Sequence, residues 1–133
     1  MKDPREATAR DLMSKRVVTL APEMDVLRAM QILIDEGISG APVVDEHGNL
    51  VGILTQRDCL DVGLLGVYHR EPAGCVRDHM KSPVQTLEAT ATLAEILEAF
   101  RASRYRRFPV LEGNRLVGQI SRRDTLPALL ALW

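Results

Sequence analysis

The chain has 133 residues with a net charge of −1 at pH 7, and 46% of them are hydrophobic and 26% charged, which is typical of a soluble globular protein rather than a disordered one. Aromatic residues make up only 4%, which disfavours a platform for stacking single-stranded nucleic acid. No apolar run approaches the roughly 18 residues needed to span a bilayer, and the charged N-terminus has no apolar signal core behind it, so we expect a cytoplasmic protein without membrane contact.

The chain consists of one pattern used twice. A shift of 67 residues aligns residues 10–13 (RDLM) with 77–80 (RDHM) and residues 42–43 (PV) with 109–110 (PV). After a one-residue deletion in a turn, LVG at 50–52 matches LVG at 116–118. We therefore expect two domains, residues 8–69 and 75–133, joined by a linker at residues 70–74. Because a copy of about 60 residues is marginal alone, the copies should pack sheet against sheet.

Each copy should begin with a short helical lead-in, at residues 8–14 and 75–81, and a short strand, at residues 17–19 and 84–86. An amphipathic helix follows, capped by Asp25 in the first copy and by a capping box from Thr92 to Glu95 in the second. Apolar residues at positions i, i+3, i+4 and i+7 predict one buried stripe on each helix. These residues are Val26, Ala29, Met30 and Leu33 in the first copy, and Leu93, Ile96, Leu97 and Phe100 in the second.

A hairpin and a closing helix should complete each copy. The hairpin strands are expected at residues 41–44 and 50–54 and at residues 108–111 and 116–120, with turns containing Gly48 and Gly113. The closing helices should start near Thr55 and Ser121, and Pro127 should kink or restart the second one because proline removes a helical hydrogen bond. The predicted fold class is α/β (α+β), with two β-α-β-β-α repeats.

The junction between the last strand and the closing helix carries the same polar pattern in both copies, at residues 52–58 (GILTQRD) and 118–124 (GQISRRD). A hydroxyl residue, Thr55 or Ser121, lies three positions before Asp58 or Asp124. Together with free N–H groups at the helix start, these side chains can hold a ribose and its phosphates. The same spacing is also an ordinary helix N-cap. Both interpretations remain open.

Other chemistries have less support. His47, His69 and His79 lie far apart in the repeat, and Cys59 and Cys75 match no metal-ligand spacing, so we expect no metal site. No histidine accompanies the hydroxyl and aspartate pairs, so we expect no catalytic residue, no enzymatic activity and no cofactor.

Residues 1–69 carry seven Lys/Arg and eleven Asp/Glu, a net −4, whereas residues 70–133 carry ten and seven, a net +3. This asymmetry indicates an anion site supplied by the second half, or simply two halves that attract each other. The net charge of −1 disfavours a nucleic-acid partner.

Residues 8–126 resemble a pair of cystathionine β-synthase (CBS) domains, called a Bateman module. The resemblance is carried by "DLMS…VVTL…GISGAPVVD…GNLVGILTQRD" and its second version "DHMK…VQTL…SRYRRFPVLE…NRLVGQISRRD". It implies pseudo-twofold packing of the copies and two clefts for adenosine ligands: AMP, ADP, ATP or S-adenosylmethionine. It also implies a homodimer and the regulation of another, unknown protein.

The resemblance further implies which residues line each cleft. Asp58 and Asp124 should bind the ribose hydroxyls, since a carboxylate can accept from two donors, and Thr55 and Ser121 should contact ribose or phosphate. The first cleft would combine Asp58, Thr55 and Arg57 with Thr86, Arg106, Arg107, Phe108 and Pro109. The second would combine Asp124, Ser121, Arg122 and Arg123 with Thr19, Ile38, Ser39, Gly40, Ala41 and Pro42. The arginines near the first cleft favour a phosphorylated ligand there, although a solvated helix end would also explain them.

Two functions are therefore predicted for comparison. The first is a stand-alone sensor in which binding of an adenosine ligand changes how the copies, or two modules, pack together. The alternative is a dimerisation or adaptor module whose clefts stay empty.

Overall fold

The computed structural model describes residues 3–69 and 71–133. They form two compact units, each described here by itself. Unit 1 contains the N-terminal residues through Val17 together with Gln85–Trp133, and unit 2 is Val18–Val84. The units therefore do not share the boundaries of the sequence repeats. The lead-in of the first repeat belongs to unit 1, and the lead-in of the second repeat belongs to unit 2.

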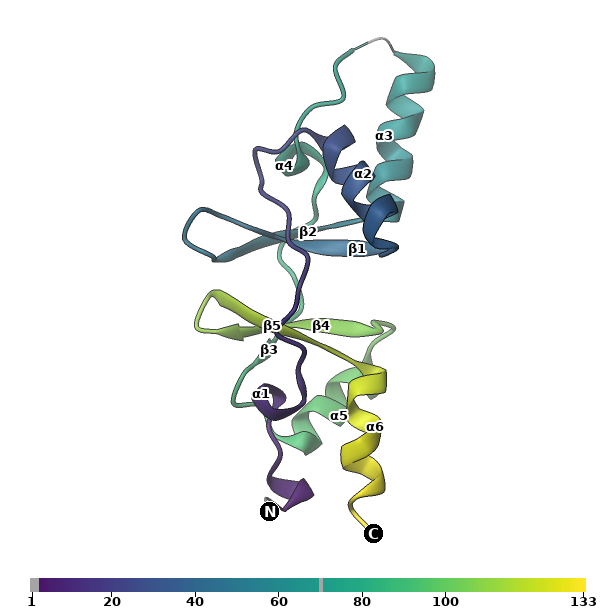
Figure 1. Ribbon diagram of the computed structural model, residues 1–133. Coiled ribbons are helices and arrows are strands. Elements are labelled where there is room, and N and C mark those ends of the chain that lie inside the picture. The colour runs from purple at the N-terminus through teal and green to yellow at the C-terminus, as the bar shows by residue number, and fades with distance from the viewer. Residues whose placement is uncertain (1–2, 70) are drawn as a thin grey trace. The chain divides into compact units, whose positions relative to one another are not determined.

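Unit 2 is an antiparallel β-hairpin with two helices on one face (Figure 1). Asp25 begins the first of these helices by accepting a hydrogen bond from the N–H of Leu27. Gly37 ends it in the left-handed conformation, φ +64°, which glycine adopts without strain. The elements of unit 2 are α2 (Val26–Glu36), β1 (Gly40–Val44), β2 (Leu50–Thr55), α3 (Gln56–Tyr68) and α4 (Val76–His79).

Unit 1 repeats this arrangement and adds one strand. Its hairpin is again antiparallel, and a short third strand pairs parallel with its first strand. Thr92 and Glu95 form the predicted capping box at the start of the first long helix. The elements of unit 1 are η1 (Pro4–Glu6), α1 (Ala9–Leu12), β3 (Leu87–Glu88), α5 (Leu93–Ala102), β4 (Arg107–Glu112), β5 (Arg115–Ser121) and α6 (Arg122–Leu130).

Each unit has its own core, built largely from the predicted apolar stripe and the hairpin. Met30 and Leu97, which were predicted within the stripes, are only half-buried. The core of unit 2 comprises Leu20, Val26, Ala29, Leu33, Ala41, Val43, Leu54, Val62 and Val76. The core of unit 1 comprises Ala9, Leu87, Ala89, Ala91, Ile96, Phe100, Phe108, Val110 and Ile120. The predicted α+β class is thereby confirmed. Sheet-to-sheet packing of the copies concerns the placement of the units and stays a prediction.

The lead-ins join the hairpins through the same backbone contacts in both units. In unit 2, Lys81 exchanges two backbone hydrogen bonds of 2.9 and 3.0 Å with Ile53 of β2. In unit 1, Ser14 exchanges two of 2.8 and 2.9 Å with Gln119 of β5. Lys81 and Ser14 occupy equivalent positions in the two repeats. Each unit is therefore completed by a segment from the other repeat.

Glycine allows this close crossing. A Cβ atom on Gly52 would lie 2.6 Å from the sulfur of Met80 and 3.0 Å from the carbonyl oxygen of Lys81. A Cβ atom on Gly118 would lie 2.5 Å from the sulfur of Met13 and 2.8 Å from the carbonyl oxygen of Ser14. Neither position has room for a side chain unless the lead-in moves, so the two glycines of the repeated LVG motif have a packing role.

One prediction on secondary structure was wrong, and a second was wrong in part. The first strand of each repeat begins later than expected: residues 84–86 precede β3, and residues 17–19 precede a single parallel bridge between Leu20 and Val43. In addition, α6 runs through Pro127 without the restart that was one of the two expected outcomes, whereas the kink stays a prediction. Pro127 and Arg123 are both exposed, so water can bond the carbonyl that the proline leaves without a partner. Among the described residues, no helix is long and apolar enough to cross a membrane.

Candidate functional site

The strand-to-helix junction of unit 2 is a capping box. The Asp58 Oδ2 atom accepts hydrogen bonds from the Thr55 N–H at 2.9 Å and from the Thr55 hydroxyl at 3.0 Å. In return, the Asp58 N–H donates to the Thr55 hydroxyl oxygen at 3.4 Å. The capping interpretation of the motif is therefore correct for the structure as it stands. It leaves the other carboxylate oxygen, Oδ1, for a different partner.

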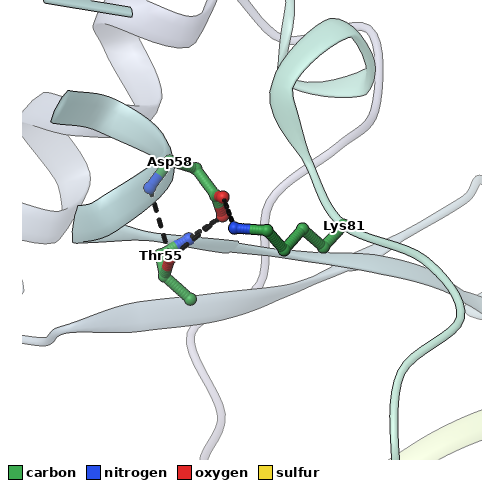
Figure 2. Close-up of polar contacts among 3 residues, drawn as sticks. All are labelled: Thr55, Asp58 and Lys81. Carbon is green, nitrogen blue, oxygen red and sulfur yellow. Dashed lines mark hydrogen bonds and ion pairs between the residues drawn. The ribbon is translucent and has the colours of Figure 1, made fainter. Parts of the chain in front are cut away.

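That partner is Lys81, whose Nζ lies 2.5 Å from the Asp58 Oδ1 atom (Figure 2). The Asp58 side chain is only 3% exposed, whereas that of Lys81 is 61% exposed. Burial raises the pKa of Asp58, but the hydrogen bonds from Lys81 and from the N–H and hydroxyl of Thr55 outweigh it, so the pKa lies below its ordinary value. Asp58 is thus a buried carboxylate that stays ionised because three donors surround it.

The equivalent junction in unit 1 has the cap but lacks the cation. The Asp124 Oδ2 atom accepts from the Ser121 N–H at 2.8 Å, and the Asp124 N–H donates to the Ser121 hydroxyl at 3.2 Å. Asp124 is half-buried. Ser14 stands at the position of Lys81, and within residues 3–69 and 71–133 no side chain donates a hydrogen bond to the Oδ1 atom of Asp124.

In each unit the loop before the first hairpin strand lies beside the start of the closing helix. Ser39 accepts a backbone hydrogen bond of 2.8 Å from Gln56 in unit 2, and Arg106 accepts one of 3.0 Å from Arg122 in unit 1. Strand pairing places Arg107 opposite Ser121. The structure thus brings together, within one unit, residues that the resemblance to CBS domains divides between two clefts.

In unit 1 these residues line a pocket of about 410 Å³, formed by Arg106, Arg107, Ser121, Arg122 and Arg123. We call it the arginine pocket. All four arginines are exposed, and no ion pair of the described residues involves any of them. The equivalent positions in unit 2 hold Ser39, Gly40, Thr55, Gln56 and Arg57. Unit 1 therefore gathers four positive charges where unit 2 has one.

The other predicted site residues are dispersed within their units. Thr19 lines a second pocket of about 590 Å³ in unit 2, where Arg77 and Glu23 form an ion pair of 2.7 Å. Thr86 is half-buried and immediately precedes β3. Ile38 is half-buried before β1, and Ala41, Pro42, Phe108 and Pro109 are buried in the first hairpin strands. Contacts implied between residues of different units stay predictions.

Sequence reasoning missed Lys81. A signal for this position was present in the sequence: Lys81 aligns with Ser14, and each follows a methionine. What the sequence did not indicate is that this lead-in crosses β2 of the first repeat, beside Asp58.

Burial, followed by the charge of Asp58, raises the pKa of the neighbouring Cys59 thiol, which keeps that thiol protonated. Among the described residues, no group of His, Cys, Asp and Glu side chains could hold a metal ion.

Comparison with protein families gives two matches to the CBS domain family, at residues 9–65 and 76–131. An uncharacterized protein of Methanopyrus kandleri is 44% identical over 61 residues, which make up 46% of this chain and 31% of the relative. The inosine-5'-monophosphate dehydrogenase of Methanocaldococcus jannaschii is 34% identical over 119 residues, 89% of this chain but only 23% of the enzyme. The chain therefore spans less than a third of the length of these relatives.

Among solved structures, the chain is similar to CBSX2 from Arabidopsis thaliana, which has been solved in complex with AMP. The TM-score is 0.79 at 24% identity, and the likeness covers 92% of this chain and 96% of that one. At this level of identity the comparison shows a shared fold.

Proposed function

Because the chain belongs to the CBS domain family, we propose that it is a regulatory module that binds a phosphorylated adenosine ligand and passes the signal to a partner protein. The observation that carries this proposal is the arginine pocket at the start of α6. CBSX2, which shares the fold, was solved with AMP, and this supports the class of ligand.

The phosphates are assigned to the arginine pocket. The four guanidinium groups have no carboxylate partner among the described residues. They repel one another, and an anion that binds among them relieves this repulsion. Arginine matches phosphate geometry through paired N–H donors. S-adenosylmethionine carries a positive sulfonium, so the pocket disfavours it. We therefore expect affinity to increase from adenosine to AMP, ADP and ATP, and to decrease with added salt.

The ribose is assigned to the carboxylates of the capping boxes. Asp124 is the better acceptor, since its Oδ1 atom receives no side-chain donor from the described part of the chain. A ribose presents two adjacent hydroxyl donors, which a carboxylate can bind together. Replacement of Asp124 by Asn turns one acceptor oxygen into an NH₂ donor and so should weaken binding while it keeps the shape of the side chain.

Nucleotide binding by calorimetry tests the proposal. Arg107→Ala and Arg123→Ala should each weaken ATP binding about tenfold to a hundredfold, because a hydrogen bond to a charged group contributes about 1.5–3 kcal/mol. Arg115→Ala is the matched control, since Arg115 is an exposed arginine as well but lies on β5, outside the arginine pocket. Equal affinity for ATP in the wild type, both pocket variants and the control would remove the proposed site.

Thermal stabilisation gives a second measurement. A ligand at 100 times its Kd should stabilise the protein by about 2.7 kcal/mol. If none of adenosine, AMP, ADP, ATP and S-adenosylmethionine raises the Tm, the adaptor function is favoured instead.

A specific observation supports that alternative. Leu60, Leu64 and Val67 follow one another at helical spacing on α3, with exposed fractions of 70%, 55% and 76%. An apolar stripe of this kind is typical of a contact with another protein. We propose that it joins two copies in a homodimer. Leu64→Glu should then convert the dimer to a monomer in light scattering, whereas Leu130→Glu, which alters an exposed leucine on α6, serves as the control.

A further inference from the structure

The two carboxylates of the capping boxes differ in what already occupies them. The Oδ2 atom of Asp58 receives two donors from Thr55, and its Oδ1 atom receives the Lys81 ammonium at 2.5 Å. The Oδ2 atom of Asp124 receives the Ser121 N–H, and the described residues supply its Oδ1 atom with no side-chain donor. One carboxylate is therefore satisfied within its own unit, and the other retains an oxygen for a ligand.

The backbone of Lys81 is held beside Asp58 by its own hydrogen bonds. Its N–H and carbonyl are both hydrogen-bonded to Ile53 of β2, and its carbonyl would lie 3.0 Å from a Cβ atom on Gly52. From this backbone position, which follows α4, the Lys81 side chain reaches the carboxylate of Asp58 in α3. The Lys81 side chain is 61% exposed, so its ammonium can leave Asp58 for water without a change in the fold.

We propose that Lys81 competes with a ribose for the carboxylate of Asp58, so that the Asp58 site is closed by the protein's own cation while the Asp124 site is open. This inference rests on the proposed function. A ribose hydroxyl that replaces the ammonium still donates a hydrogen bond to the ionised carboxylate, but the attraction between two opposite charges is lost. It also leaves a buried carboxylate without its ion-pair partner. The lysine thus makes the two sites of the repeat unequal.

The repeat itself supplies the test. Lys81→Ser introduces the residue of the other repeat, Ser14, and Ser14→Lys makes the reciprocal change. Each is combined with a change that disables the other site: Lys81→Ser with Asp124→Asn, and Ser14→Lys with Asp58→Asn. The probe is adenosine, because it has no phosphate that could attract the released ammonium. Affinity is measured by calorimetry or by ligand-detected NMR.

In the Asp124→Asn background, Lys81→Ser should increase the affinity for adenosine about tenfold, which corresponds to about 1.4 kcal/mol. In the Asp58→Asn background, Ser14→Lys should decrease it by a similar factor. Lys15→Ser is the control, since it also removes one lysine charge, from the exposed residue that follows Ser14 and for which the described chain shows no ion pair. It should change neither affinity.

A second readout does not depend on any ligand. The carboxyl carbon of Asp58 can be titrated by NMR, and Lys81→Ser should raise the pKa that it reports. An unchanged pKa would show that the ion pair does not form in solution and would overturn the inference. Weaker adenosine binding in Lys81→Ser would also overturn it, because Lys81 would then be a ligand contact.

The failure of the proposed function has a different signature. If Lys81→Ser raises the pKa of Asp58 but adenosine, AMP and ATP bind to none of the variants or the wild type, the ion pair is purely structural, and both the proposed function and the competition are wrong. If AMP binds to the wild type while Lys81→Ser leaves adenosine affinity unchanged, the proposed function stands and the competition alone is refuted.

Discussion

Unit 1 and unit 2 build the same junction from the same pattern and then surround it with different charges. In both, a hydroxyl residue caps the closing helix and an aspartate completes the cap. In both, a glycine admits the lead-in of the other repeat. Yet unit 2 adds a lysine to the carboxylate, whereas unit 1 adds four arginines beside the cap. The two units therefore share the residues that build the junction and differ in the charged residues that surround it.

The largest expected effect tests the part that the units share. Gly52→Ala and Gly118→Ala should each lower the free energy of unfolding by about 1–3 kcal/mol, because the new Cβ atom meets a backbone carbonyl that cannot rotate away. Urea unfolding monitored by circular dichroism would measure both. Gly63→Ala is the control: it is a helical glycine with nothing within 4 Å of the added Cβ atom, and it should be neutral or stabilising. A neutral result at one of the two crossing glycines would contradict an equivalent crossing in both units.

Loss of the N-cap hydroxyl should destabilise unit 2 more than unit 1. Ser121→Ala should cost about 1 kcal/mol, the usual effect of losing an N-cap side chain. Thr55→Ala should cost about 2 kcal/mol, because it also removes a donor from the buried Asp58 carboxylate. Thr55→Ser, which keeps the hydroxyl, should recover most of the loss. Equal costs for the two alanine variants in chemical unfolding would show that burial of Asp58 adds nothing to its cap.

The ion pair between Asp58 and Lys81 predicts that the stability of the protein depends on pH. The pKa of Asp58 is below its ordinary value in the folded protein, so its contribution to stability is complete above the unfolded pKa of about 3.9 and is lost as the pH falls through the folded pKa. Lys81→Ser should lower stability by about 1 kcal/mol near pH 7, a modest value because the lysine is largely exposed. The difference from wild type should shrink below about pH 4. Thermal unfolding between pH 3 and 7 would measure it, and a difference that stays constant over this range would rule out the ion pair as its cause.

The smallest effect concerns the arginine pocket. Arg107→Ala or Arg123→Ala should raise the free energy of unfolding by at most about 0.5 kcal/mol at low salt, since removal of one charge reduces repulsion among the remaining three. The gain should disappear at about 1 M salt, where such interactions are screened. Arg57→Ala, at the position in unit 2 equivalent to Arg123, is the control and should show no such gain. Stabilisation by all three substitutions would indicate a general effect of charge and not of the pocket.

Much of the fold could be predicted because it depends on local signals. Asp25, Thr55, Thr92 and Ser121 begin helices as predicted, since a short polar side chain at the N-cap satisfies a free N–H group whatever lies around it. The first strands were predicted too early because backbone pairing depends on the neighbouring strand. In the described part of unit 2, this segment pairs with β1 through the bridge of Leu20 to Val43 alone.

The candidate site could be predicted only in part. The sequence identifies Asp58 and Asp124 through the repeat, but Gly52 and Gly118 offer identical openings, so it does not say which lead-in crosses which hairpin. For that reason Lys81 was missed, and the four arginines were assigned to separate clefts. Their convergence depends on the pairing of Arg107 with Ser121, a contact between residues 14 positions apart that only the register of the hairpin determines.

The exchange of lead-ins also has a consequence for synthesis on the ribosome. Unit 2 is one uninterrupted segment, Val18–Val84, and can complete its hydrogen bonds as soon as Lys81 has left the exit tunnel. The lead-in of the first repeat emerges before unit 2, but its partner Gln119 is made about a hundred residues after Ser14. This lead-in therefore stays without its partner strand while unit 2 is made and folds. During that interval the lead-in of the first repeat could pair incorrectly with β2, because Gly52 leaves the same space there as Gly118 leaves in β5.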